Sequence, residues 1–279
     1  MTFKRGARLN PGQVRDLRGA GRGRGLGLPG GFGLPGGGGS SGGGGGIPLP
    51  VGGGIGAILL VVAVVAIMFI FSGGLGGTQT NLGPGGDAAI NGPGSSTLQT
   101  ECVTGEDANE RLDCRIVGFV NSIQDYWTDE FAASGQTYRQ AQTTLFSDSV
   151  QTGCGGATSQ TGPFYCPADE NVYLDLGFFD VLESQYGASS GPLAQAYVVA
   201  HEYGHHVQNL TGVLSRAQDG TTGPQSSAVR VELMADCYAG VWAGNAVNSE
   251  YLEPLTESEV RQALDAAAAV GDDRLQQAA

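Results

Sequence analysis

Residues 201–205, His-Glu-Tyr-Gly-His, constrain the fold of this 279-residue chain more than any other feature. On an α-helix, side chains four positions apart lie above one another on the same face. His201 and His205 can therefore direct two imidazole nitrogens at one metal ion. Glu202 lies one step around the helix, where its carboxylate can reach a water on that ion. The first expectation is a helix that presents these three side chains inside a folded domain.

The flanking residues favour such a helix. Pro192 suits a first helical position, a Tyr-Val-Val run follows at 197–199, and Gly212 is a typical stop. We therefore expect a helix over about residues 192–211. The His-Glu-x-x-His spacing is typical of zinc peptidases, in which the glutamate is the general base. The alternative is a helix whose histidines are only structural.

A catalytic zinc site needs a third protein ligand. The chain contains three histidines, and the third, His206, points about 100° away from His205 on the same helix. The remaining ligand must therefore be a carboxylate or a cysteine. Glu232 and Asp236 are four residues apart and share one face of a second expected helix. We predict Glu232 as the ligand and Asp236 as the acceptor that orients a ligand histidine.

The second helix is expected to begin at Ser226 or Ser227, which can cap it after the break at Gly223-Pro224. Its apolar residues indicate a mostly buried helix, in which unpaired carboxylates are costly. Those apolar residues are Val231, Leu233, Met234, Ala235 and Cys237. The alternative is a solvated acidic face without a metal.

Five longer stretches carry a resemblance to a known family: HEYGHHVQNLTG at 201–212, VELMADCYAGVWA at 231–243, VGDDRLQ at 270–276, LFSDSVQTGCG at 145–155 and FYCPADENVYLDLGFF at 164–179. They resemble the neutral zinc metallopeptidase family of bacteria. The likeness covers about residues 100–276. It implies a gluzincin-like peptidase with one Zn²⁺ per chain on His201, His205 and Glu232, and with Glu202 as the catalytic residue.

Members of that family usually continue beyond the VGDDR segment with a stretch that contains a His-Gly-Ser-like motif. This sequence stops at Ala279. The resemblance therefore implies that any substrate-binding or oxyanion-stabilising residue of that stretch is missing and that activity is tempered. His206, Tyr203 and Tyr238 are the nearby residue types that can donate to an oxyanion, and none of them is assigned this role.

Charge divides the chain sharply. Residues 1–50 hold seven of the 14 basic residues and one of the 27 acidic residues, so they carry +6 and the remainder carries −19. From about 21 to 54 the sequence is mostly glycine with leucine and proline, which is too poor in bulky apolar groups to fold. We predict a disordered, basic, cytoplasmic tail over 1–50; a phosphate cradle or a nucleic-acid arm is the alternative.

Residues 55–71 are apolar and uncharged, and Val51 extends the neutral stretch to twenty-one residues, enough to span a bilayer. We predict a transmembrane helix over 51–71; a cleaved signal peptide and a buried core helix are the alternatives. Lys and Arg lie before the span, and none lies within 35 residues after it. The N-terminus is therefore expected in the cytoplasm and the catalytic domain outside it. Residues 72–100 are expected to form a flexible linker.

The cysteines fit an oxidising compartment. Cys102 and Cys114 are twelve residues apart, as are Cys154 and Cys166. Two local disulfides are the simplest of the three connectivities that four cysteines allow. Cys237 is left over; either it packs as a small hydrophobe, or its partner lies in the missing tail.

The domain over 101–279 is expected to be α+β: mainly helical and zincin-like, with a small antiparallel sheet, and preceded by the single transmembrane helix. Apolar residues at helical spacing predict a packing helix over 106–127. Strands are expected near 143–150, 163–166 and 172–176, with a hairpin turn at 167–171. Residues 171–177 are the candidate edge strand for aligning an extended substrate.

Together these features predict a single-pass peptidase of the bacterial cell membrane that hydrolyses peptide bonds in peptides or proteins. The alternative is a weak or inactive zincin-fold binding or scaffold protein at the cell surface. A zinc hydrolase acting on non-peptide amides is a third reading. The acidic remainder argues against nucleic acid as a partner, because phosphates are repelled. The oligomeric state is open.

Overall fold

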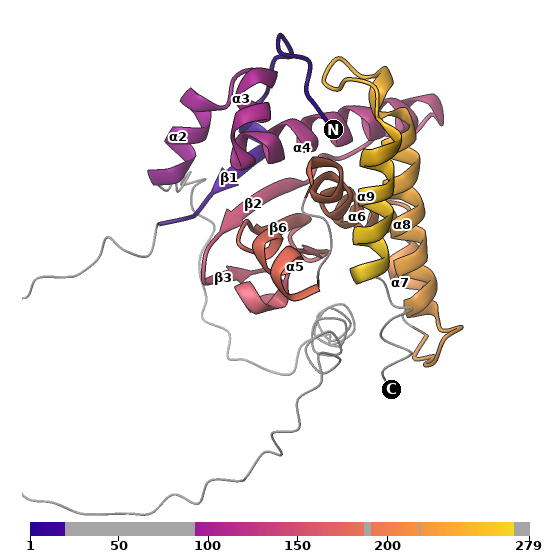
Figure 1. The fold of residues 1–279 in the computed structure, drawn as a ribbon. Helices are drawn as coiled ribbons and strands as arrows, with labels where there is room; N and C mark the ends of the chain where they lie inside the picture. Colours follow the sequence, from indigo (N-terminus) through magenta and orange to yellow (C-terminus); the bar gives the residue numbers. More distant parts are fainter. Residues whose placement is uncertain (20–92, 187–190, 218, 271–279) are drawn as a thin grey trace, which may run out of the picture.

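The computed structural model describes residues 1–19, 93–186, 191–217 and 219–270 (Figure 1). The helices are α2 (Pro93–Glu101), α3 (Gly105–Glu110), α4 (Leu112–Ala133), α5 (Phe178–Tyr186), α6 (Pro192–Leu210), α7 (Val213–Arg216), α8 (Ser227–Asn245) and α9 (Glu257–Val270). The strands are β1 (Val14–Asp16), β2 (Gln142–Phe146), β3 (Ser149–Thr152), β4 (Gly155–Thr158), β5 (Phe164–Cys166) and β6 (Asn171–Asp175). Short 3₁₀ turns occur at η1 (Pro11–Gln13), η3 (Ser159–Thr161) and η4 (Ala246–Asn248). The fold is α+β and mainly helical, as predicted.

The main sheet has the strand order β1-β2-β6-β5. β2 pairs in parallel with both β1 and β6, whereas β5 and β6 form an antiparallel hairpin. β3 and β4 form a separate antiparallel pair. The predicted hairpin around residues 167–171 is confirmed. The prediction of a small antiparallel sheet is wrong for the main sheet, because the chain returns after β3, β4 and β5 to place β6 beside β2 in the same direction.

The first nineteen residues are folded, which corrects the prediction of a disordered tail for that part of 1–50. β1 extends the sheet beside β2, and Phe3, Leu9 and Val14 are buried in the main core. These apolar side chains are spaced along a segment whose average composition is basic and polar. Residues 20–50 lie outside the described residues.

The predicted membrane span over 51–71 also lies outside the described residues. Within the described ranges, no helix is both long and apolar enough to cross a bilayer. Of the predicted linker, residues 72–92 lie outside the described part. Residues 93–100 belong to α2 instead, so the prediction of a flexible linker is wrong there.

α6 is the central helix of the domain. It packs against α4, α8, α9 and strand β5, and Figure 1 shows it between the sheet and the α8–α9 pair. Its observed bounds, Pro192–Leu210, agree with the predicted helix to within one residue. Pro192 occupies the first turn, and Gly212 follows with φ 72°, a left-handed conformation that suits glycine.

α8 begins as predicted, with the side chain of Ser226 accepting a hydrogen bond from the backbone N–H of Val229. It is not mostly buried, however. Its buried side chains lie on the face toward α6 and α4, namely Val231, Ala235, Ala239 and Trp242. Leu233 is 59% exposed and Cys237 is exposed, because no described element covers the opposite face. Of the two alternatives for Cys237, packing as a small hydrophobe is therefore wrong.

The predicted helix over 106–127 is present but interrupted. α3 ends at Glu110, Arg111 is extended with φ −122° and ψ 135°, and α4 then begins at Leu112. Ile116, Val120 and Ile123 are fully buried, as their spacing predicted.

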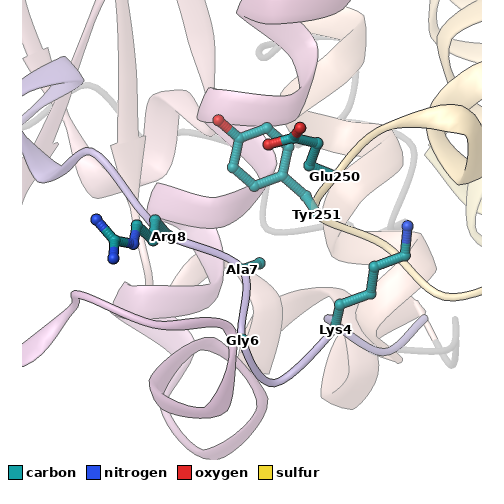
Figure 2. Close-up of a pocket in the computed structure, with 6 residues that line it drawn as sticks. All are labelled: Lys4, Gly6, Ala7, Arg8, Glu250 and Tyr251. Atoms are coloured by element: carbon teal, nitrogen blue, oxygen red, sulfur yellow. The ribbon is translucent and has the colours of Figure 1, made fainter.

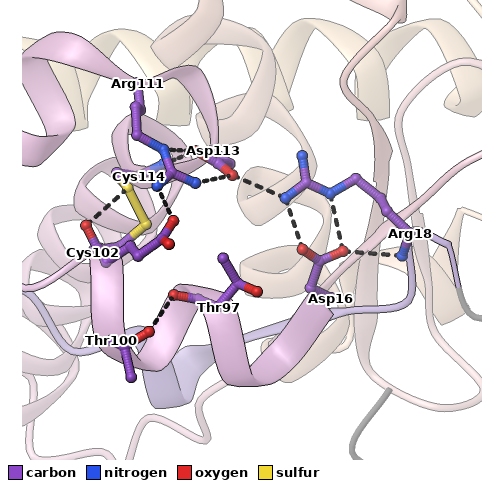
Figure 3. Close-up of polar contacts among 9 residues, drawn as sticks. Asp16, Arg18, Thr97, Thr100, Cys102, Arg111, Asp113 and Cys114 are labelled. Carbon is purple, nitrogen blue, oxygen red and sulfur yellow. Dashed lines mark hydrogen bonds and ion pairs between the residues drawn. A yellow bond between two sulfur atoms is a disulfide. The ribbon is translucent and has the colours of Figure 1, made fainter. Parts of the chain in front are cut away.

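Both predicted disulfides are confirmed. Cys102 is bonded to Cys114 and Cys154 to Cys166. The first bond joins the end of α2 to the start of α4, and it lies beside the ion pairs that Arg111 makes with Glu101 and Asp113 (Figure 3). The second ties the β3–β4 turn to β5, and so fixes β5 from the side opposite to α6.

Candidate metal centre

Two helices bring the predicted ligands together. His201 and His205 lie one turn apart on α6, with ring centroids 4.8 Å apart, and Glu232 faces them from α8. The helices approach closely at Gly204. A Cβ atom there would lie 2.9 Å from the Cα and 3.0 Å from the carbonyl oxygen of Ala235. Glycine is therefore required between the two histidines for α8 to carry Glu232 so near.

The Nε2 atoms of both histidines converge on one oxygen of Glu232. The Nε2 of His201 lies 3.2 Å from Oε2 and the Nε2 of His205 lies 3.4 Å from it. One ligand atom from each residue falls within 4.8 Å of the others. Ligands bonded to zinc at about 2.0–2.1 Å in a tetrahedron lie about 3.3 Å apart. The donor types and their separations therefore fit a zinc ion.

Each imidazole is oriented through its other nitrogen. His201 Nδ1 lies 2.8 Å from Oδ1 of Asp236, and His205 Nδ1 lies 2.9 Å from Oε1 of Gln208. The amide nitrogen of Gln208 donates to the carbonyl of Val231 at 2.7 Å, which leaves its oxygen as the acceptor for His205. Both Nδ1 atoms therefore act as donors, and both Nε2 lone pairs are left to face Glu232.

The charges of the site favour a cation. Burial lowers the pKa of His201, but hydrogen bonds to Asp236 and Glu232 outweigh burial, so the pKa is raised overall. Burial likewise opposes a raised pKa at His205, and the nearby carboxylate of Glu232 overcomes it. For Glu232, burial raises the pKa, and the two histidines lower it to a value below the ordinary one. The carboxylates thus favour positive charge on the two imidazoles. A metal cation can supply this charge instead of the protons.

Glu202 is buried beside the histidines, with 8% of its surface exposed. Burial raises the pKa of this carboxyl group above its ordinary value, while His201 and His205 act in the opposite direction. The backbone N–H of Tyr165, on β5, donates a hydrogen bond to its carboxylate. A carboxylate with a raised pKa in such a position is a better proton acceptor near neutral pH.

The three side chains considered as oxyanion donors have other partners. His206 is fully buried and lies 2.6 Å from the carbonyl oxygen of Arg139 through Nε2. The Tyr203 hydroxyl is 2.9 Å from Oγ1 of Thr143 in the core. Tyr238 packs edge-on against Trp127. The structure therefore gives His206 and Tyr203 packing roles on the sheet side of α6.

The predicted edge strand is wrong. β6, which contains most of residues 171–177, lies inside the sheet between β2 and β5. β5 is the edge strand of the described sheet on this side, and it contacts α6 directly. The pairing of β6 with β2 decides this, and no local sequence pattern reports that pairing.

Four residues of the site escaped the sequence reasoning: Tyr197, Gly204, Gln208 and Tyr165. The Tyr197 hydroxyl donates a hydrogen bond to Asp236, the carboxylate that also holds His201. Tyr197 and Gln208 lie four residues before His201 and three after His205, so the helical spacing could have found both. The roles of Gly204 and Tyr165 depend on contacts between separate elements and had no such signal.

The chain is similar in sequence to a described family and to several bacterial proteins. A sequence model of the family described as "Putative neutral zinc metallopeptidase" matches residues 34–279. An uncharacterized protein of Mycobacterium tuberculosis is 53% identical over 185 residues, which cover 64% of this chain and 62% of that protein. The uncharacterized Escherichia coli protein YpfJ is 40% identical over 238 residues, which cover 83% of this chain and 76% of that protein. The chain thus spans about three fifths of the length of its mycobacterial relative. No solved structure matches the chain.

Proposed function

Because this chain belongs to the neutral zinc metallopeptidase family, we propose that it is a membrane-attached zinc endopeptidase that hydrolyses peptide bonds in peptides or proteins. The observation that carries the proposal is the convergence of two imidazole Nε2 atoms on Glu232, at separations that suit ligands of one zinc ion. His201, His205 and Glu232 are the proposed ligands. Asp236 is proposed to orient His201.

A zinc ion held there would supply Lewis-acid chemistry, which activates water and polarises the scissile carbonyl. Glu202 takes the proton from the attacking water as general base and returns it to the nitrogen of the leaving amine. Asp236 and Gln208 keep the imidazole rings in the orientation and tautomer that zinc binding requires.

β5 is the proposed docking strand for the substrate. It is the edge strand beside α6, and an extended peptide can add to such an edge through main-chain hydrogen bonds. Tyr165 lies in this strand and contacts Glu202, so a peptide aligned on β5 passes close to the proposed base.

Attachment to a bacterial membrane through residues 51–71 is part of the proposal. The uncharged, apolar composition of this stretch supports it. The two disulfides support an oxidising location for the catalytic domain, which in bacteria is outside the cytoplasm.

The test compares the purified full chain with Glu202→Gln and with Glu130→Gln, a matched change at an exposed glutamate of α4. We expect one zinc per chain in all three proteins. Cleavage of casein is expected in the wild type and in Glu130→Gln, and it is expected to be lost in Glu202→Gln. Zinc binding without cleavage of casein or of a broad peptide library would instead support a zincin-fold binding or scaffold protein.

A further inference from the structure

The hydroxyl of Tyr165 is held by two side chains of α6. His206 Nδ1 lies 3.0 Å from this hydroxyl, and Asn209 Nδ2 donates to it at 3.0 Å. The Nε2 of His206 lies 2.6 Å from the carbonyl oxygen of Arg139, so Nε2–H donates to that carbonyl and Nδ1 is left to accept the hydroxyl proton of Tyr165.

The backbone of the same tyrosine touches the proposed base, because its N–H donates to Glu202. Glu202 and His206 are four residues apart on α6, hence neighbours on one side of the helix. α6 therefore contacts Tyr165 at two points: His206 bonds to its hydroxyl, and Glu202 accepts from its backbone amide. The bond between Cys154 and Cys166 holds the adjacent position of β5.

Resting on the proposed function, we propose that His206 and Tyr165 are positioning residues for Glu202. By fixing β5 against α6, the His206–Tyr165 contact keeps the Tyr165 amide on the carboxylate. A carboxylate bound at one point by a rigid donor has less rotational freedom, so it is oriented for proton transfer before substrate binds. The same contact fixes the edge strand relative to the base.

Two variants at one position test this proposal. His206→Leu removes both polar contacts, whereas the amide oxygen and nitrogen of His206→Gln can accept from Tyr165 and donate to Arg139. We expect His206→Leu to keep one zinc per chain, while kcat falls about tenfold. His206→Gln should recover most of kcat. If the leucine variant does not fold, Tyr165→Phe removes only the hydroxyl and has the same expected effect.

A measurement independent of cleavage separates this proposal from the proposed function. In the full chain, hydrogen exchange of the Tyr165 amide should be slow in the wild type and in His206→Gln, and faster in His206→Leu and Glu202→Ala. If the wild type cleaves nothing, the proposed function fails while the exchange result still decides the positioning contact. Unchanged exchange and unchanged kcat in a folded His206→Leu protein would overturn the proposal.

A separate observation concerns the N-terminal segment, residues 1–19. Its backbone bonds to parts of the domain that are remote in sequence: Leu9 N–H to Val103, Lys4 N–H to Tyr251, Gly105 N–H to Ala7 and Glu253 N–H to Thr2, at 2.8–2.9 Å. β1 adds three residues in parallel register to β2. The segment is therefore a strand and strap of the same folded unit as residues 93–270.

Side chains also join residues 1–19 to the rest of the domain. Phe3 is 1% exposed, and its ring lies 5.2 Å from that of Phe119. Arg18 pairs with Asp16 at 2.6 Å and with Asp113 at 2.9 Å (Figure 3). Separation of the segment from the domain would expose the buried ring and remove an edge strand from the sheet.

We infer that residues 1–19 and residues 93–270 lie on the same side of the membrane. The apolar stretch 55–71 falls between them in sequence. A single crossing there would put about 30 Å of hydrocarbon between β1 and β2, which cannot then pair. The sequence-based orientation, with the N-terminus in the cytoplasm and the domain outside, is incompatible with the observed strand pairing.

Cysteine accessibility in intact cells tests this inference. Cys237 is free and exposed and reports on the domain. Gly6 lines an open pocket with Lys4, Arg8, Glu250 and Tyr251 (Figure 2), and a Cβ atom there meets nothing within 4 Å, so Gly6→Cys reports on the segment. The Gly6→Cys change is made in a Cys237→Ser background, so that each full-length protein carries one reactive thiol.

A membrane-impermeant maleimide should label both thiols in intact cells, or both only after lysis. Labelling of one thiol in intact cells and of the other only after lysis would overturn the inference and restore the single-crossing orientation.

Discussion

Phe3 and Gly118 form a contact whose energy can be worked out from the structure. The Phe3 ring lies over the helical glycine so closely that a Cβ atom at 118 would be 2.3 Å from Cε1 and 2.6 Å from Cζ of the ring. Deleting a fully buried phenylalanine side chain costs about 3–5 kcal/mol of unfolding free energy. We therefore expect Phe3→Ala to destabilise the protein by that amount.

Gly118→Ala is predicted to change stability in opposite directions in the wild type and in the Phe3→Ala background. In the wild type, Gly118→Ala forces the ring to move and should cost about 1–3 kcal/mol, as overpacked core substitutions do. In Phe3→Ala, the methyl group enters vacated space. The helix then gains about 0.5–1 kcal/mol, because alanine is a better helix former than glycine. The two changes should therefore couple by about 1.5–4 kcal/mol.

The assay is urea unfolding of the wild type, the two single variants and the double variant, all full-length and in the same detergent. Tryptophan fluorescence monitors the unfolding. Midpoints are compared at a common slope, so that a shift reports stability alone. An equal cost of Gly118→Ala in both backgrounds would contradict the predicted coupling, since it would mean that the Phe3 ring does not lie over Gly118 and that residues 1–19 are not part of the folded unit.

Three further results are expected. Gly204→Ala places a methyl group 2.9 Å from the Cα of Ala235, so it should separate α6 from α8, lower stability by about 1–3 kcal/mol and weaken zinc binding. The control Gly240→Ala, on the open face of α8, should neither lower stability nor weaken zinc binding. Thermal unfolding and zinc titration measure the two effects. Gln208→Leu removes the acceptor for His205 and should weaken zinc binding about 10–100-fold by competition with a chelator; unchanged affinity would contradict the role given to Gln208. For Asp113, burial raises the pKa, but hydrogen bonds to Arg111 and Arg18 outweigh burial and lower the pKa overall. The ionised carboxylate therefore stabilises the fold above about pH 4, and this stabilisation is lost as the pH falls through the folded pKa. Asp113→Asn should destabilise the protein at pH 7 and match the stability of the wild type in acid, and a stability difference that is constant across the pH range would contradict this.

The proposed ligands were accessible from sequence because each depends on a local signal. His201 and His205 share a helix whose start, period and stop are all local features of residues 192–212. Glu232 was reached by elimination of histidines and by its four-residue spacing from Asp236. The structure brings these side chains together, and the only added requirement is Gly204, which sets how closely two separate helices approach.

Apart from Tyr197 and Gln208, whose helical spacing from the histidines is a local signal, the features that the sequence did not reveal are non-local. Phe3 packs against Gly118 and Phe119, which lie more than a hundred residues away in the sequence. Without knowledge of these partners, a basic segment with scattered apolar residues resembles a disordered tail. Whether β5 or β6 is the edge strand depends on which of them pairs with β2. The exposure of Leu233 depends on which elements cover α8, and its apolar character carries no such information.

Zinc content of the purified full chain tests whether Glu232 completes the metal site. We expect one zinc per wild-type chain after dialysis, retained in Glu130→Ala and largely lost in Glu232→Ala, because two imidazoles alone hold zinc weakly. Circular dichroism should show that the Glu232→Ala protein is still folded. One tightly held zinc in folded Glu232→Ala would contradict the account, because the ion would then be held without the carboxylate on which both imidazoles converge.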